Sequence, residues 1–482
     1  MFVVSHDPTS RYRPKLLFRP LSLQDLPADI LPPILAQLSD RADWHSCALV
    51  SKVFNRVATP LLYRTLDSRI ISKSVVHHPS ATLLKRPEYA QYVRRVTETG
   101  AVHRCTLPRY SNITKDTLEA LALCKNLESI TWIDDSSITD STLLSFIAVI
   151  RKHPLQEINI RTHSDLGTAV WAEIHNHVGL RKISIWCMEG PPRVLQGWSA
   201  SLGDTLTHLE LGVSAYSYPC SDLLSQLPKL KDLRLKGAPA TMIPTIMAYL
   251  LDLRSLDTEY PGSYSSRRHG DEDIHRPAFP SLRELTVRTS SIDSFGPLKL
   301  WGWIRALVPK PGLETLKLHA FTINSGHTSI PRMFILDLAV VHGETLKHFM
   351  VGETQLTLRD IECLCTKFPK LETLVCSTAS PDIQSITDSI SVAKNLQTLR
   401  LHVQWIPNDL SIATDWSTVP DFTMQHATNL MLRTDDSKLR TIAIGSTLYT
   451  GKWVLEEPGK ENVESKLTFQ VMGEVAEDRW QT

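Results

Sequence analysis

The chain has 482 residues, 42% of them hydrophobic, which is too long for one compact core of ordinary size and calls for several domains or an extendable repeat. Its 52 Lys and Arg against 51 Asp and Glu leave a formal net charge of +1, so no global field draws it toward nucleic acid or anionic lipid. We expect neither a nucleic acid nor a membrane as its partner.

Three short helices are the first predicted elements, within residues 21–68, after a tail at residues 1–20. Apolar spacing predicts the first helix over residues 33–38 and the second over residues 43–49. Ser51 is the expected N-cap of the third, which we expect to end at Thr59 because Pro60 follows. About 45 residues bury too little apolar surface to be stable alone, so several of these side chains should face a partner or the next domain.

This segment resembles the F-box in the order of its residues. The residues that carry the resemblance are Leu26-Pro27, Ile30-Leu31, Ile34-Leu35, Leu38, Ala48 to Lys52, Phe54-Asn55 and Pro60 to Tyr63. It implies binding to a Skp-family adaptor and, through that adaptor, to a cullin-RING ubiquitin ligase. The adaptor contacts that it implies are Leu26, Pro27, Ile30, Ile34, Leu35, Leu49 and Val50. The alternative is that these helices only cap the apolar end of the next domain.

A repeat organises most of the remaining chain, residues 69–447. Leucine, two variable residues, an aliphatic, one variable residue and a second aliphatic recur, with variations, in twelve copies, and Val93 begins a degenerate first copy. The leading leucines, called anchors below, are Leu127, Leu155, Leu180, Leu206, Leu230, Leu253, Leu282, Leu313, Leu346, Leu371, Leu396 and Leu439. They are 23 to 33 residues apart, except for a last step of 43.

Each copy should form a short strand, because alternate side chains of a strand point the same way, followed by a helical return that covers the apolar side. The pattern resembles leucine-rich repeats of the helical-return type. The expected fold is therefore an α/β solenoid, a leucine-rich-repeat array preceded by a small all-α, three-helix F-box-like module. A doubly wound α/β domain would use the same alternation of strands and helices and is the alternative.

Two interruptions and a C-terminal cap complete the predicted organisation. Residues 261–280 are polar and rich in turn residues, which indicates an exposed loop. Residues 403–438 form an insertion whose Trp405, Trp416 and Phe422 should pack on the array or cap an edge. Residues 448–482 contain two alternating segments, 448–455 and 467–471, that predict a β-rich cap.

Side chains two, four and six residues after each anchor should point away from the core and meet a target protein. The expected target-binding residues on this face are Arg161, Trp186, Arg234, Lys236, Arg288, Lys317, His319 and Arg400. For Trp186, an exposed interface anchor and a side chain packed beneath residues 188–193 are equally open interpretations.

No catalytic or metal-binding motif stands out. The chain has no GxGxxG, GxxxxGK[ST], GxSxG or HExxH sequence, and the pair His175 and His177 lacks further ligands, which favours surface histidines. We therefore expect no cofactor and no enzyme, although a hydrolase assembled from distant repeats stays conceivable. The N-terminus does not resemble a secretory signal, and the eight cysteines are scattered, which predicts a cytoplasmic or nuclear protein.

The predicted function is that of a substrate-recognition subunit in a Skp-cullin-F-box ubiquitin ligase. A ligase-independent repeat scaffold is the alternative. Deletion of residues 1–68 separates the two hypotheses, because removal of a cap should cause aggregation or partial unfolding, whereas loss of a docking module should leave the array soluble.

Overall fold

The structure, a computed structural model, describes residues 29–72, 75–105, 108–136, 140–164, 166–187, 197–212, 220–260, 279–289, 297–320, 329–406, 422–445, 447–456 and 466–475. The chain divides into two compact units, Met1–Ile130 with Lys152–Pro154 and Thr131–Arg151 with Leu155–Thr482. The predicted loop at residues 261–280 lies almost entirely outside the described residues. None of the described helices has the length and apolar character needed to span a membrane.

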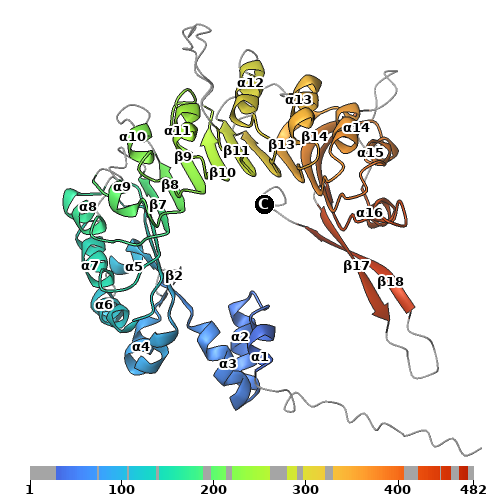
Figure 1. The fold of residues 1–482 in the computed structure, drawn as a ribbon. Coiled ribbons are helices and arrows are strands. Elements are labelled where there is room, and N and C mark those ends of the chain that lie inside the picture. Colours follow the sequence, from blue (N-terminus) through green and yellow to red (C-terminus); the bar gives the residue numbers. More distant parts are fainter. Residues whose placement is uncertain are drawn as a thin grey trace, which may run out of the picture. The chain divides into compact units, whose positions relative to one another are not determined.

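The first unit begins with three helices and continues into short strands and helices (Figure 1). Its elements are α1 (Leu31–Leu35), α2 (Arg41–Val50), α3 (Lys52–Leu62), β1 (Thr65–Asp67), β2 (Arg69–Ser72), β3 (Val75–His77), α4 (Ser80–Lys85), η2 (Pro87–Tyr92), β4 (Arg95–Thr99), α5 (Gly100–His103), η3 (Pro108–Tyr110) and α6 (Ile113–Leu123). Strand β1 pairs parallel with β4, and β2 pairs antiparallel with β3.

The start of each helix in the module has a local cause in the sequence. Asp40 caps α2 through the Ala42 N–H. Ser51 caps α3 through the Phe54 N–H, as predicted. Helix α1 is shifted to Leu31–Leu35 because two prolines occupy its first turn, where a missing N–H costs nothing.

The predicted end of α3 at Thr59 is wrong. The helix continues through Pro60 to Leu62, and the Tyr63 N–H still donates to the Thr59 carbonyl. Pro60 removes one backbone hydrogen bond in the last turn, but Leu61 and Leu62 pack against the core of the module. Tertiary packing therefore outweighs the helix-breaking tendency of Pro60.

The second unit is a regular succession of strands and helices. Strand β5 (Ser129–Asp134) begins at the boundary, and the strands that follow it are β6 (Glu157–Thr162), β7 (Lys182–Cys187), β8 (His208–Gly212), β9 (Asp232–Lys236), β10 (Ser255–Glu259), β11 (Glu284–Thr289), β12 (Thr315–Ala320), β13 (His348–Leu356), β14 (Thr373–Ser380), β15 (Thr398–Trp405), β16 (Thr441–Ile444), β17 (Thr447–Glu456) and β18 (Lys466–Val475). The helices are α7 (Asp140–Ile150), α8 (Thr168–Ile174), α9 (Ser199–Leu202), α10 (Cys220–Leu224), α11 (Ile243–Tyr249), α12 (Pro297–Leu307), α13 (Arg332–His342), α14 (Leu358–Lys367), α15 (Ile383–Ser389) and α16 (Met424–Met431).

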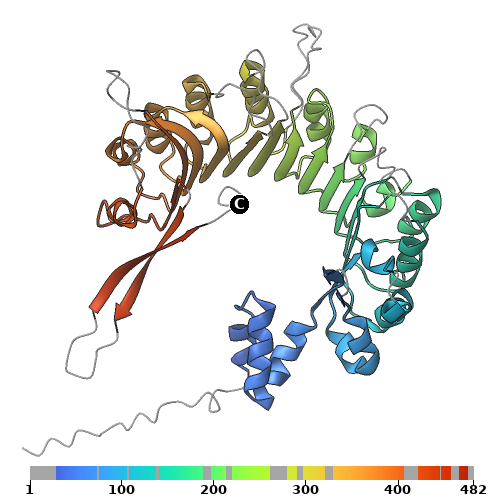
Figure 2. The same cartoon turned by 180° about the vertical axis from the view of Figure 1, so that it is seen from behind.

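From β6 to β16 the strands lie in chain order, and each pairs parallel with the next. Within this unit the helices lie on the outer side of the curved sheet and the strands line its inner side (Figures 1 and 2). A doubly wound sheet reverses its strand order and carries helices on both faces, so this order excludes it. The second unit is a repeat-like parallel α/β sheet.

The twelve predicted strands are all present, and each begins two residues after its anchor. The carbonyl of the residue after an anchor accepts two backbone N–H groups from the next copy, as the Gln156 carbonyl does from Arg181 and Lys182 at 2.8 and 3.0 Å. The same bond pair joins Arg64 to Arg94 and Arg95, so Tyr63 occupies an anchor position that the sequence pattern does not reveal.

The core of the second unit is an apolar layer between the strands and the helices. Anchors and strand aliphatics, such as Leu180, Ile183 and Ile185, have no exposed surface, and helix residues such as Ile174 cover them. Each fully buried aliphatic contributes roughly 1.5 to 3 kcal/mol, and the layer grows with every copy.

The last copy is covered by an antiparallel hairpin, β17 and β18. Both strands fall where alternation predicts them, and each is longer than expected. In the predicted insertion, Phe422 is buried and its carbonyl accepts a hydrogen bond from the Tyr449 hydroxyl at 2.7 Å. Trp416 lies outside the described residues.

Candidate functional site

The N-terminal module leaves large apolar side chains in contact with solvent. Its core is small and consists of Leu31, Leu35, Ala48, Phe54 and Ala58. Outside that core the exposed fractions are 73% for Leu49, 59% for Val50 and 51% for Ile34, and Ile30 and Val53 are also exposed. Exposed aliphatics gathered on so small a domain are typical of a protein-binding surface.

A groove between α1 and α3 adds to this surface. It has a volume of about 590 Å³ and is lined by Pro32, Lys52, Val53, Arg56, Val57, Pro60 and Leu61. The groove depends on the continuation of α3 past Thr59, because Pro60 and Leu61 form part of its wall. Val53, Val57 and Leu61 are four residues apart, which is the spacing that could have revealed this helical face in the sequence.

The predicted adaptor-binding residues divide into three groups. Ile30, Ile34, Leu49 and Val50 are exposed and available to a partner. Leu35 is only 3% exposed and packs in the core of the module, so a role in direct contact does not fit its position. Leu26 and Pro27 lie outside the described residues.

The second candidate surface is the side of strands β6–β12 that faces away from the helices, called the open face below. The strand registers align its side chains in three rows. The first row is Glu157, Lys182, His208, Asp232, Ser255, Glu284 and Thr315; the second is Asn159, Ser184, Glu210, Arg234, Asp257, Thr286 and Lys317. The third, called the Trp186 row below, is Arg161, Trp186, Gly212, Lys236, Glu259, Arg288 and His319.

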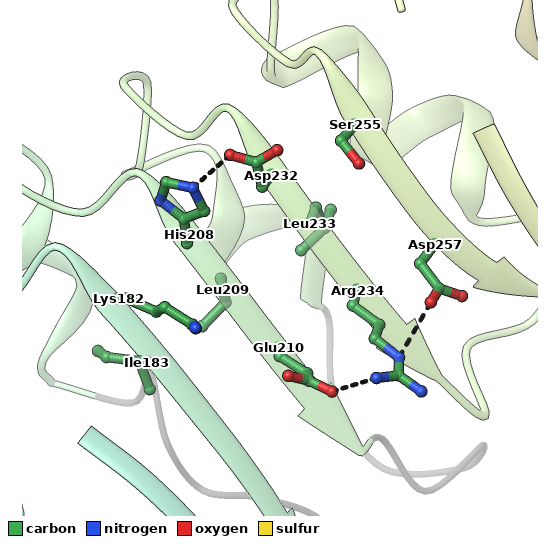
Figure 3. A pocket seen from close by; sticks show the side chains of 10 residues that line it. All are labelled: Lys182, Ile183, His208, Leu209, Glu210, Asp232, Leu233, Arg234, Ser255 and Asp257. Carbon is green, nitrogen blue, oxygen red and sulfur yellow. Dashed lines mark hydrogen bonds and ion pairs between the residues drawn. The ribbon is translucent and has the colours of Figure 1, made fainter. Parts of the chain in front are cut away.

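Ion pairs connect neighbouring strands across the second row. Arg234 lies 2.5 Å from Glu210 and 3.1 Å from Asp257, and Asp257 also accepts two hydrogen bonds from Arg288 at 2.8 and 2.9 Å. Hydrogen bonding to Asp257 raises the pKa of Arg288. Figure 3 shows Arg234 pointing between Glu210 and Asp257, at the edge of a hollow of about 200 Å³. These charges hold one another in place before any partner arrives.

Trp186 is half-buried beside this network. The Arg234 guanidinium lies 4.8 Å from the centre of its ring and the Lys236 ammonium lies 5.6 Å from it. Gly212 follows Leu211, which pairs with Ile185, so the strand between Trp186 and Lys236 carries no side chain in this row. The two cations can therefore reach the Trp186 ring over β8, and cation–π attraction stabilises both of them against the ring. The residues predicted to cover Trp186 lie outside the described part of the chain.

The other predicted target-binding residues also lie on strands, and all of them except Arg400 have side chains on the open face. Arg161 is exposed, Lys317 pairs with Glu284 at 3.0 Å, and Arg400 is half-buried on β15. Burial lowers the pKa of His319, and the nearby Arg288, Lys317 and Arg234 lower it further. The structure thus groups Arg161, Trp186, Lys236, Arg288 and His319 in one row and places Arg400 on a more distant strand.

The described residues offer no metal centre, since no three His, Cys, Asp or Glu side chains among them gather closely enough to hold an ion. The expectation that His177 lies on the surface is wrong: it is buried, and burial lowers its pKa to about 4. Burial raises the pKa of the Cys124 and Cys365 thiols to about 12, which disfavours the reactive thiolate.

Comparisons with known proteins identify the N-terminal module. Residues 23–69 match the family model described as F-box-like. No curated protein sequence matches the chain. Among solved structures, the chain resembles one from the crystal structure of the Rad7 and Elc1 complex in yeast, with 15% identity over 78% of this chain and 88% of that chain and a TM-score of 0.39. A chain from the TLR13–ssRNA13 complex has 14% identity over 73% and 60%, with a TM-score of 0.30.

The protein thus combines a small helical domain with a long, repeat-like parallel sheet. Residues 23–69 are an F-box-like domain, and α1, α2 and α3 are its helices.

Proposed function

We propose that this protein is the substrate-recognition subunit of a Skp-cullin-F-box-type ubiquitin ligase. In this role the F-box-like helices bind a Skp-family adaptor, and the strand repeats, which we interpret as leucine-rich repeats, hold a target protein on the open face. The protein contributes proximity, because it raises the effective concentration of the target near a conjugating enzyme, and it supplies no catalytic group.

The observation that carries the proposal is the exposed apolar surface of the F-box-like domain. Ile34, Leu49 and Val50 are at least half exposed, in a domain whose core, among the described residues, has five buried members. Burying a side chain of this kind against a partner gains about 1.5 to 3 kcal/mol. Adaptor binding would remove these apolar side chains from water.

Adaptor binding is tested by co-purification with a Skp-family adaptor. The informative variant is Ile34→Asp with Leu49→Asp, because both side chains are exposed and their replacement leaves the domain core intact. Leu35→Asp is unsuitable, since a buried carboxylate would unfold the domain. Val340→Asp is the matched control, because Val340 is an exposed aliphatic on α13.

We expect wild type and Val340→Asp to recover the adaptor equally, and Ile34→Asp with Leu49→Asp to lose it. Equal recovery by all three forms would reject the ligase assignment.

A second function is supported by the contacts within the first unit. The Tyr63 and Tyr89 rings lie 4.6 Å apart, and Arg41 pairs with Asp67 at 3.0 Å, so the helices pack on the residues that follow them. A ligase-independent scaffold would use the helices only as this cap. Deletion of residues 1–68 should then cause aggregation or partial unfolding, whereas loss of a docking domain should leave the repeats soluble.

We also propose a cytoplasmic or nuclear location. The described cysteines Cys47, Cys105, Cys124, Cys363, Cys365 and Cys376 are unpaired, which suits a reducing compartment. Microscopy of the tagged full chain tests this location, and a secreted protein would contradict it.

A further inference from the structure

The charges of the open face are separated along the strands. In the Trp186 row, three cations (Arg161, Lys236 and Arg288) stand against one carboxylate, Glu259. The first row has the opposite balance, with Lys182 against Glu157, Asp232 and Glu284. The two ends of the strands therefore present opposite electrostatic potentials, although the chain as a whole is nearly neutral.

Most cations of the open face already have a carboxylate partner. Lys182 pairs with Glu157, Lys317 with Glu284, Arg234 with Glu210 and Asp257, and Arg288 with Asp257. Among the described residues, Arg161 and Lys236 have none. The only carboxylate in their row, Glu259, accepts a hydrogen bond from the Gly237 N–H at 2.9 Å. Two unneutralised cations thus lie on either side of Trp186.

Contacts with neighbouring side chains restrain the cations around Trp186 before any partner binds. Trp186 restrains Lys236 through its ring, and Arg234, fixed by Glu210 and Asp257, lies against the same ring. Fixing the cations in advance lowers the conformational entropy that binding would cost. Burial is the main cause of the lowered pKa of His319 in this row, and the neighbouring Arg288 lowers that pKa further.

We propose that the Trp186 row binds an acidic protein segment, with carboxylates on Arg161 and Lys236 and an apolar side chain between them on the exposed part of Trp186. This inference rests on the proposed function, in which the open face holds the target. It adds the chemical class of the target segment.

The spacing of the cations favours two carboxylates over one phosphate. Arg161 on β6 and Lys236 on β9 are three strand spacings apart, or about 14 Å between their backbones. A phosphate is bound best by several cations that converge on one point. An extended segment covers about 14 Å in roughly four residues, so its acidic residues should be about four apart.

The test selects binders from a displayed library of random 12-residue peptides with the full-length protein. Three forms are compared: wild type, Arg161→Glu with Lys236→Glu, and Arg359→Glu with Lys370→Glu. The last form is the matched control, because it makes the same charge change at one exposed Arg and one exposed Lys distant from the open face.

We expect wild type and control to enrich peptides with two Asp or Glu residues around an apolar residue, and the Arg161/Lys236 variant to lose them. Fluorescence anisotropy with the best peptide should show at least roughly tenfold weaker binding for that variant, and for a peptide with Gln in place of the acids. Trp186→Ala should weaken binding as well. Enrichment of basic or uncharged peptides, or unchanged affinity in the Arg161/Lys236 variant, would overturn the inference.

A phosphoserine version of the best peptide separates the two anions. It should bind no more tightly than the carboxylate version, and a clear preference for it would refute the carboxylate assignment. Adaptor co-purification, measured on the same three forms, should be unaffected. Its failure in all three would contradict the proposed ligase role while the peptide result still stood.

Discussion

The F-box-like domain and the open face of the repeats expose side chains of opposite character, aliphatic in the domain and charged on the open face. The domain leaves aliphatic side chains such as Leu49 and Val50 in solvent, whereas strands β6–β12 bury their aliphatics and expose charges on the open face that mostly pair with one another. A 47-residue domain cannot enclose all its apolar residues, but each stacked repeat completes the core of its neighbour. The domain therefore keeps apolar side chains in solvent, whereas on the open face Arg161 and Lys236 are the cations that, among the described residues, have no carboxylate partner.

The comparison predicts the largest loss of stability in the repeat core. Phe349 is fully buried on β13, so Phe349→Ala should lower the free energy of unfolding by about 3 to 5 kcal/mol. Urea denaturation followed by circular dichroism measures this change. Val340→Ala, on the exposed side of α13, is the control and should change stability by less than about 0.5 kcal/mol. Equal effects would mean that the repeats do not share a continuous core.

Acid should weaken the repeats through His177. Burial lowers its folded-state pKa to about 4, whereas an unfolded histidine titrates near 6.5, so between these pH values the unfolded state binds the extra proton. Stability should fall as the pH drops from 6.5 to 4, by up to about 3 kcal/mol from this residue. Thermal unfolding at several pH values, compared with His177→Leu, measures the effect; the same slope in both forms would contradict it.

Breaking the charge network should have a smaller effect. Asp257→Asn removes the carboxylate shared by Arg234 and Arg288, and because all three side chains are partly exposed we expect a loss of about 1 kcal/mol. Asp204→Asn is the control, since Asp204 pairs with Lys229 in full solvent and should contribute almost nothing. Peptide binding to the Asp257→Asn form should also weaken, because Arg234 loses one of its two supports.

The smallest change in stability is expected for a substitution on the exposed apolar surface of the F-box-like domain. Leu49→Ser should alter the stability of the free protein by less than about 0.5 kcal/mol, because Leu49 contributes little to the domain core. The same variant should reduce adaptor recovery in co-purification. A large loss of stability would instead mean that Leu49 stabilises the folded domain. The contrast between the exposed aliphatics of the domain and the buried ones of the repeats would then be wrong.

Local patterns were sufficient to predict much of this structure. Each anchor predicted a strand that begins two residues later, and Ser51 is the N-cap of α3, as the sequence predicted. The F-box resemblance and the family match cover nearly the same residues. These signals succeed because they depend on residues close together in the chain, such as a side-chain oxygen and the N–H three positions on.

Other features escaped local reasoning. The continuation of α3 through Pro60, the burial of Leu35 and of His177, and the anchor role of Tyr63 all depend on which distant side chains pack against them. A helical spacing shows that Ile34 and Leu35 are near each other, but not which of them faces the core. Cation pairing is similar, because Arg234 meets Asp257 only through the register of two strands.

The sequence by itself determined the strand-and-helix repeat and the F-box-like segment, since periodic leucines and short caps act locally. Only the tertiary structure decided which apolar residues stay exposed on that segment, and which cations of the open face are left without a carboxylate. The reason is that burial and charge pairing are properties of neighbours in space, and strand register, rather than distance along the chain, selects those neighbours.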